Sequence, residues 1–146
     1  LPERTRRAIK HGSWLHDCGK IGVPEAILNR PGKLSAADFE VVKKHPGWGA
    51  EVGRQANLPE EVINVILYHH ERFDGRGYPT GAKGTEIPLE ARIVAVADFF
   101  DSMSTDRPYA KGYEQAEAMR VMGVLRGAAL DPQLVDIFLA GLAPTP

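Results

Sequence analysis

The sequence is poor in cysteine, in long apolar runs and in excess charge of either sign, and each shortage excludes a class of protein. A single cysteine, Cys18, rules out an intramolecular disulfide, which fits a reducing cytoplasm. The run "RIVAVADFF" is too short and too charged to span a bilayer, and we expect no signal peptide. With 18 Lys and Arg against 19 Asp and Glu, the net charge of −1 leaves no general basic field to attract a nucleic acid polymer or a membrane.

What remains is the composition of an ordinary globular protein. The chain has 146 residues, of which 43% are hydrophobic and 25% charged, so it suits one domain with a real core. It opens on "LPERTRRAIKHGSWLHD", which lacks an initiator Met and already has a helical pattern. We therefore expect a single domain over residues 1–146 that lacks its N-terminal helices.

Strand patterns are nearly absent, and helical patterns follow one another along the chain. Ser35 and Asp38 resemble a capping box, and Pro59 and Pro88 each stand at the start of an apolar segment. The segment after Pro59 should bury Val62, Ile63, Ile66 and Leu67. We predict an all-α, compact multi-helix bundle, with helices over 3–16, 35–45, 46–55, from 59 onward, 88–104, 113–125 and 132–140.

One long glycine-rich loop interrupts the helices at "ERFDGRGYPTGAKGTEIP", residues 71–88. Loops of this length in a compact domain are often functional. Its glycines permit rapid rearrangement, so it is expected to be a mobile flap with Tyr78-Pro79 as one rigid point. The alternative is an ordered loop whose glycines only serve turns.

Four of the five histidines stand at the ends of expected helices, in "LHDCGK", "KKHPGWG" and "YHHE". A single such histidine is ordinarily a helix cap or a satisfied core residue. Three similar sites favour metal binding instead, because neutral imidazole is the commonest protein ligand for transition metals. Neighbours such as His69 and His70 point about 100° apart on a helix, so they suit two metals, or a metal and a substrate. His11 lies on another face and is expected to be structural or exposed.

Carboxylates interrupt the most apolar segment, "RIVAVADFFDSMS". Asp98 and Asp101 stand at i and i+3, on one face of the expected helix. A buried unpaired carboxylate costs several kcal/mol, and a metal ion would remove that cost. The alternative is that each Asp pairs with an arginine, for which Arg92 and Arg107 are available.

The stretch "HDCGK" adds His16 and Asp17, a mixed nitrogen and oxygen ligand pair of the kind that iron and manganese accept. Lys20 follows a glycine turn and could face the same space, although a solvated surface lysine is the alternative. Cys18 is read as a small buried residue, because the neighbouring Asp17 disfavours its thiolate.

These segments together resemble the HD-GYP domains, a branch of the HD phosphohydrolase superfamily known as bacterial cyclic di-GMP phosphodiesterases. The resemblance rests on "HDCGKIGVPEAILNRPGKLS", "HPGWGAEV", "HHERFDGRGYPTGAKGTEIPLEARIVAVADFFDSMSTDRPY" and "LDPQLVDIF", which cover roughly residues 9–140. It implies two divalent metal ions, iron or manganese, with Asp17 bridging them. The metal ligands that it implies are His16, Asp17, His45, His69, His70 and Asp98.

The resemblance also implies the substrate contacts. Lys20 matches a lysine near the scissile phosphate and is, with Asp17, expected to be catalytic. The remaining contacts implied are Tyr78, Asp101 and Arg107. Relatives carry a basic residue directly after "RPY", where this chain has Ala110 and then Lys111, so Lys111 is the candidate there. The family usually supplies a further His, and sometimes a Glu, from a helix that precedes this segment.

Three functions remain open at this point. The first is hydrolysis of cyclic di-GMP to the linear dinucleotide, to GMP, or to both. The second is a non-hydrolytic cyclic-dinucleotide-binding or partner-docking module, whose "GYP" loop would grip a protein such as a diguanylate cyclase. The third keeps the chemistry but takes another cyclic dinucleotide or a nucleotide monoester. A sensory or receiver domain is expected upstream.

Overall fold

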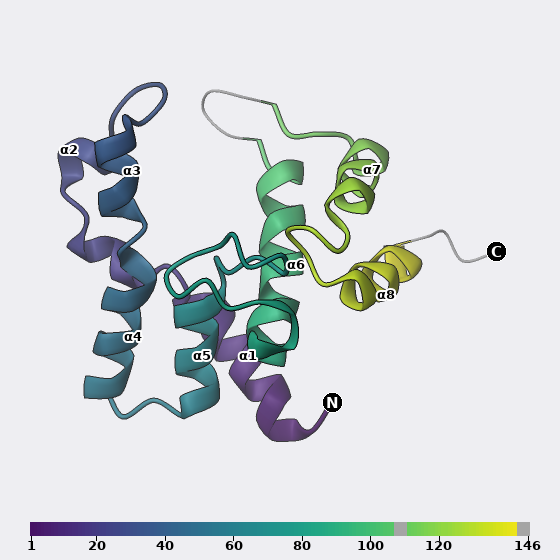
Figure 1. Ribbon diagram of the computed structural model, residues 1–146, viewed down its shortest axis with the longest axis horizontal. Helices are drawn as coiled ribbons and strands as arrows, with labels where there is room; N and C mark the ends of the chain where they lie inside the picture. The colour runs from purple at the N-terminus through teal and green to yellow at the C-terminus, as the bar shows by residue number, and fades with distance from the viewer. Residues whose placement is uncertain (107–110, 143–146) are drawn as a thin grey trace.

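The computed structural model describes residues 1–106 and 111–142, and this part of the chain is helical with no strand (Figure 1). The predicted all-α fold is confirmed. No helix of the described residues is long and apolar enough to cross a membrane. The elements are α1 (Glu3–Leu15), η1 (Cys18–Gly22), α2 (Glu25–Leu28), α3 (Ala36–Val42), α4 (His45–Gln55), α5 (Glu60–Tyr68), η2 (Gly84–Glu86), α6 (Leu89–Ser104), α7 (Gln115–Leu125) and α8 (Pro132–Leu142).

Local signals set several helix starts. Ser35 and Asp38 form the expected capping box at α3, in which the Ser35 hydroxyl accepts from the Asp38 amide at 3.1 Å. Pro59 and Pro88 directly precede α5 and α6, where a missing amide hydrogen costs nothing. Helix bounds could therefore be predicted to within a few residues from caps and prolines.

Helix α5 is the centre of the N-terminal half, and it contacts α1, α4 and α6 (Figure 1). It buries Val62, Ile63 and Ile66 as expected, but its fourth buried residue is Val65, whereas Leu67 is only partly buried. Val65 is enclosed because α1 approaches it at Gly12, where an added Cβ would lie 2.5 Å from the Val65 Cβ. The expectation for Leu67 was wrong because α5 packs against three neighbouring helices, so its buried residues do not form the single stripe that the helical period predicts.

A second close approach joins η1 to α4. A Cβ on Gly19 would lie 1.9 Å from the carbonyl oxygen of His45, so only glycine allows the two backbones to meet. This contact brings Asp17, at the end of α1, next to the first residue of α4.

The C-terminal helices form a separate cluster on the far side of α6 (Figure 1). Val96, Met122 and Val135 are buried at its centre. Arg92 of α6 donates to Asp131 at 2.5 Å, and Asp131 also accepts from the amides that open α8. The pair is nearly enclosed, so it fixes α8 against α6.

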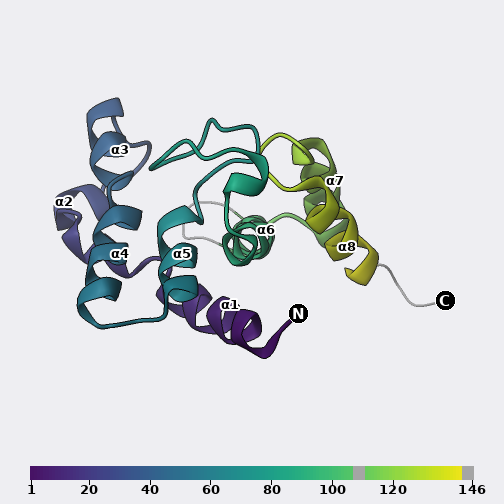
Figure 2. The same cartoon turned by 60° about the horizontal axis from the view of Figure 1, so that its bottom comes forward.

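The loop after α5 runs over the top of these helices, from the side of α3 towards the segment between α7 and α8 (Figure 2). At one end the Tyr78 ring meets Phe39 of α3, with ring centroids 6.2 Å apart. At the other, the amides of Phe73 and Asp74 donate to the carbonyls of Ala129 and Ala128 at 3.1 and 2.8 Å. The loop thus spans the two halves of the domain.

Candidate metal centre

Four side chains that could each donate one ligand atom meet where α1, α4 and α5 come together. The relevant atoms of Asp17, His45, His69 and His70 all lie within 4.8 Å of one another. Nε2 of His45 lies 3.2 Å from the Asp17 carboxylate, and Nε2 of His69 lies 3.8 Å from it. The end of α1, the start of α4 and the end of α5 each supply part of the group.

Backbone carbonyls orient three of the imidazoles. Nδ1 of His45 lies 2.7 Å from the carbonyl of Val42, and Nδ1 of His69 lies 2.9 Å from that of Ile66. His16 has the same arrangement with the carbonyl of Ser13, at 2.7 Å. A carbonyl only accepts, so each Nδ1 must carry the hydrogen, and each neutral ring keeps its lone pair on Nε2.

The centre fits a cation and leaves unfavourable contacts without one. The Nε2 atoms of His45 and His69 lie 3.4 Å apart, and two lone pairs at that distance repel each other. Oδ1 of Asp17 is buried beside them, and no hydrogen bond reaches it from the described residues. A buried, unpaired carboxylate oxygen facing imidazole lone pairs is the arrangement that a divalent ion relieves.

His16 and Asp98 extend this group towards α6. Nε2 of His16 lies 3.6 Å from a carboxylate oxygen of Asp17 and 3.6 Å from one of Asp98. The six expected metal ligands therefore form one continuous cluster. The alternative in which Arg92 neutralises Asp98 is wrong, because Arg92 is bound to Asp131 on the other side of α6.

Burial and mutual contacts keep the cluster in its ligating protonation state. Burial disfavours the charged carboxylate of Asp17, but the hydrogen bond and positive charge of Lys20 oppose this, and the pKa of Asp17 lies well below its usual range. Burial lowers the pKa of His69, and burial with neighbouring imidazoles lowers the pKa of His70 to about 3. At neutral pH Asp17 thus offers an ionised carboxylate, and His69 and His70 offer neutral imidazoles, which are the metal-binding forms.

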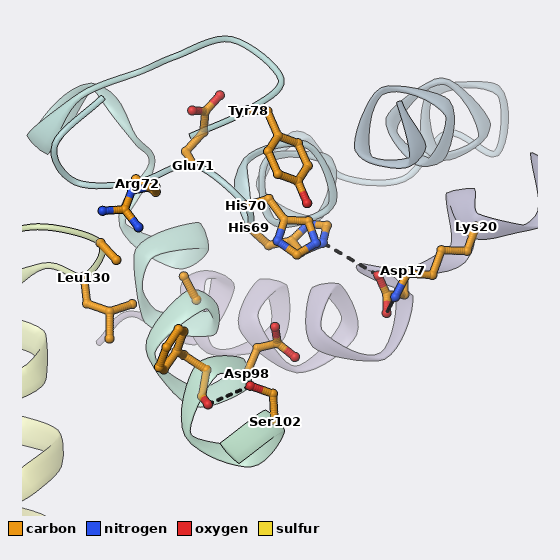
Figure 3. Close-up of a pocket in the computed structure, with 13 residues that line it drawn as sticks. Asp17, Lys20, His69, His70, Glu71, Arg72, Tyr78, Asp98, Ser102 and Leu130 are labelled. Atoms are coloured by element: carbon orange, nitrogen blue, oxygen red, sulfur yellow. Dashed lines mark hydrogen bonds and ion pairs between the residues drawn. The ribbon is translucent and has the colours of Figure 1, made fainter. Parts of the chain in front are cut away.

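Lys20 and Tyr78 face the cluster from different sides, with Tyr78 above the histidines and Lys20 beside Asp17 (Figure 3). Nζ of Lys20 lies 2.5 Å from Oδ2 of Asp17, so the lysine is directed towards the site and not out into solvent. The Tyr78 ring stacks on His70, with centroids 4.9 Å apart. Burial, together with Asp17 and Asp98, raises the pKa of Tyr78 to about 12, so its hydroxyl stays a hydrogen-bond donor.

Glu71, which the sequence did not single out, holds the loop that carries Tyr78. Its carboxylate is 4% exposed and accepts from the Thr80 amide at 2.6 Å, the Thr80 hydroxyl at 2.8 Å and the Gly81 amide at 3.0 Å. Gly77 packs so closely that an added Cβ would lie 2.3 Å from the amide nitrogen of Arg72. These contacts support the ordered-loop alternative over a mobile flap.

A cavity of about 470 Å³ opens from the cluster along α6. Beyond the expected residues, its walls include Glu71 and Arg72 from the loop, Ala95, Phe99 and Ser102 from α6, and Ala129 and Leu130 before α8. Ala95 stands three residues before Asp98 and Ser102 four residues after it, so the helical period could have indicated them. Arg72, Ala129 and Leu130 carried no such signal.

Two of the remaining expected substrate contacts, Asp101 and Lys111, lie away from this cavity. Asp101 is exposed, accepts from the Thr105 hydroxyl at 3.3 Å and does not line this cavity. Lys111 is exposed and borders a different cavity, beside Tyr113. Arg107 lies outside the described residues. His11, expected to be structural or exposed, is exposed.

Comparison with known proteins gives consistent results. Residues 1–134 match the model of the HD domain family. The cyclic di-GMP phosphodiesterase response regulator RpfG of Xanthomonas campestris pv. campestris is 43% identical over 98% of this chain and 38% of its own length. The 3′3′-cGAMP-specific phosphodiesterase 2 of Vibrio cholerae is 34% identical over 95% of this chain and 27% of its own length. This chain therefore spans little more than a third, or less, of the length of these relatives.

Among solved structures, Bd1817, an HDG"Y"P protein from Bdellovibrio bacteriovorus, superposes with a TM-score of 0.77. The match covers 97% of this chain and 45% of that one at 24% identity, so it supports the fold. The family model, the helical fold and the ordered series of motifs agree, and the chain belongs to the HD domain family, in its HD-GYP branch.

Proposed function

We propose that this chain is a metal-dependent phosphodiesterase domain that hydrolyses cyclic di-GMP to the linear dinucleotide, to GMP, or to both. The observation that carries the proposal is the set of imidazole lone pairs gathered around the buried, unpaired oxygen of Asp17. The names of the relatives support the substrate class.

The proposed ligands are His16, Asp17, His45, His69, His70 and Asp98. Their donor atoms are nitrogen and oxygen without a thiolate, which favours iron or manganese over structural zinc. Two ions are proposed, because His16 and Asp98 lie at one end of the cluster and His70 at the other. When bound there, such ions would supply an activated water and Lewis acidity towards a phosphoryl oxygen.

The chain's own residues would then position the phosphodiester and stabilise its charge. Lys20, held by Asp17 at the mouth of the cluster, places an ammonium where negative charge develops on phosphoryl oxygens. The neutral Tyr78 hydroxyl could donate a hydrogen bond from above the histidines. Arg107 is retained as a further phosphate contact from the resemblance alone.

The test is turnover. The purified protein, loaded with Fe²⁺ or Mn²⁺, should convert cyclic di-GMP to the linear dinucleotide or GMP, followed by chromatography of the products. Binding of cyclic di-GMP to metal-loaded protein without any turnover would refute the enzyme and leave the non-hydrolytic binding module. Preferred turnover of 3′3′-cGAMP would favour that cyclic dinucleotide as the substrate. It is included because the Vibrio relative is named as a phosphodiesterase specific for it.

The biological setting is part of the same proposal. A cytoplasmic signalling protein of bacteria, with a sensory or receiver domain before this one, agrees with the description of one relative as a response regulator. Docking of a diguanylate cyclase on the "GYP" loop is retained as a prediction.

A further inference from the structure

The cavity has two chemically different ends (Figure 3). At one end, Asp17 and His69 belong to the metal cluster, and Lys20 adds an ammonium that is paired with Asp17. At the other end the loop contributes Arg72, close to Leu130. The apolar part of the cavity wall comes from Ala95 and Phe99 of α6 and from Ala129 and Leu130, and the loop also contributes Glu71, which is bound to Thr80 and Gly81. A phosphate suits the first end, and a flat heteroaromatic ring with hydrogen-bond acceptors suits the second.

Arg72 is held in a fixed orientation. Its Nε and Nη2 donate to the two carboxylate oxygens of Asp74 at 3.1 and 2.7 Å. Asp74 is itself fixed, since its amide donates to the carbonyl of Ala128, next to the residues that line this end of the cavity. Within residues 1–106 and 111–142, the structure gives Nη1 of Arg72 no hydrogen-bond partner. The guanidinium is thus preorganised and keeps donors for a ligand.

The ion pair of Arg72 with Asp74 makes this end of the cavity better suited to an uncharged base than to a phosphate. Arg72 and Asp74 form a bidentate ion pair, with Nη2 of Arg72 2.7 Å from Oδ2 of Asp74. Their charges cancel at close range. Arg72 therefore acts as an oriented hydrogen-bond donor with little net attraction for an anion.

We propose that Arg72 is a specificity-determining residue that donates hydrogen bonds to the acceptor edge of a guanine, with Phe99 and Leu130 packing on the base. Guanine presents O6 and N7 as adjacent acceptors, which a guanidinium meets in a bidentate fashion, whereas adenine offers a donor in place of O6. Asp74 is a positioning residue for Arg72. This inference rests on the proposed function and adds the choice of base to it.

The experiment compares substrates that share a phosphodiester linkage but differ in their bases. The purified protein, loaded with Mn²⁺, is assayed for kcat/KM on cyclic di-GMP, 3′3′-cGAMP, cyclic di-AMP and the base-free bis(p-nitrophenyl) phosphate. Where a dinucleotide is not turned over, its inhibition constant is measured. The variant is Arg72→Gln, because glutamine pairs with adenine in the way that arginine pairs with guanine. Its matched control is Arg120→Gln, which breaks a similar bidentate pair with Glu117 on the exposed face of α7.

Arg72→Gln should lower kcat/KM for cyclic di-GMP by roughly 5- to 150-fold and that for cyclic di-AMP by much less, so the guanine preference falls. Arg120→Gln should leave the preference unchanged. Should Arg72→Gln fail to fold, Asp74→Asn keeps Arg72 but loosens it, and the guanine preference should again fall, by a smaller factor.

Equal losses on guanine and adenine dinucleotides would show that Arg72 only holds the loop, and would overturn the inference while leaving the proposed function intact. An unchanged preference would overturn it as well. Absence of turnover for all four phosphodiesters would refute the proposed function, and this inference would fall with it.

Discussion

Removing the carboxylate of Glu71 should release the loop that carries Tyr78, and the structure allows the cost to be worked out. In Glu71→Ala, the amides of Thr80 and Gly81 and the Thr80 hydroxyl lose their acceptor. Hydrogen bonds to a charged group contribute about 1.5–3 kcal/mol each. Thr80 and Gly81 are themselves exposed, so water replaces part of what they lose. The two amide bonds, taken at the lower end, give a loss of about 2–4 kcal/mol in the free energy of unfolding.

The assay is urea denaturation followed by circular dichroism, with Glu86→Ala as the matched control. Glu86 also accepts a loop amide, that of Lys83 at 2.9 Å, but it is exposed and its bond is easily replaced by water. The control should therefore lose about 0.5 kcal/mol or less, as surface substitutions do. Turnover of cyclic di-GMP should fall in Glu71→Ala, because Tyr78 is no longer held against His70. A loss below about 1 kcal/mol, or one equal to that of the control, would refute the clamping role of Glu71.

The other predictions concern the cluster and its scaffold. Asp17→Ala should abolish turnover and reduce bound metal, measured by elemental analysis; a variant with normal metal content and activity would contradict the ligand role. Lys20→Ala should lower kcat by about 10²–10³-fold with metal content unchanged, and a change confined to KM would contradict transition-state stabilisation. Gly19→Ala should destabilise the fold, since its Cβ would overlap the His45 carbonyl, while Gly123→Ala, which meets no neighbour in α7, should stabilise it by about 0.5–1 kcal/mol. Similar melting temperatures for the two glycine variants would refute this account of the contact between η1 and α4.

Local rules predicted the helices because their signals lie within a few residues of each helix end. The capping box at Ser35 and the prolines at 59 and 88 act on the backbone that follows them directly. The buried face of α5 was only partly predictable, because Val65 is enclosed by Gly12, more than 50 residues away. Such close approaches depend on tertiary packing, which periodicity does not contain.

The ligand set could be found from residue type and position, although its members span residues 16–98. Histidines repeated at helix ends and aspartates in an apolar helix are costly unless something uses them. The loop contacts were not predictable in this way. Glu71 directly follows the two histidines of "YHHE" and resembles an ordinary surface charge, yet it is among the least exposed acidic residues of the described chain.

The two halves of the cavity show why the substrate contacts were harder to predict than the metal ligands. Metal ligands must converge on a point, so their identities constrain one another. Substrate contacts need only line a volume, and here the cavity walls come from α6, the loop and the segment before α8. The backbone hydrogen bonds from Phe73 to Ala129 and from Asp74 to Ala128 join that segment to the loop. The base-facing wall is therefore built by the contact between the two halves of the domain, and the same contact holds it next to the cluster supplied by α1, α4 and α5.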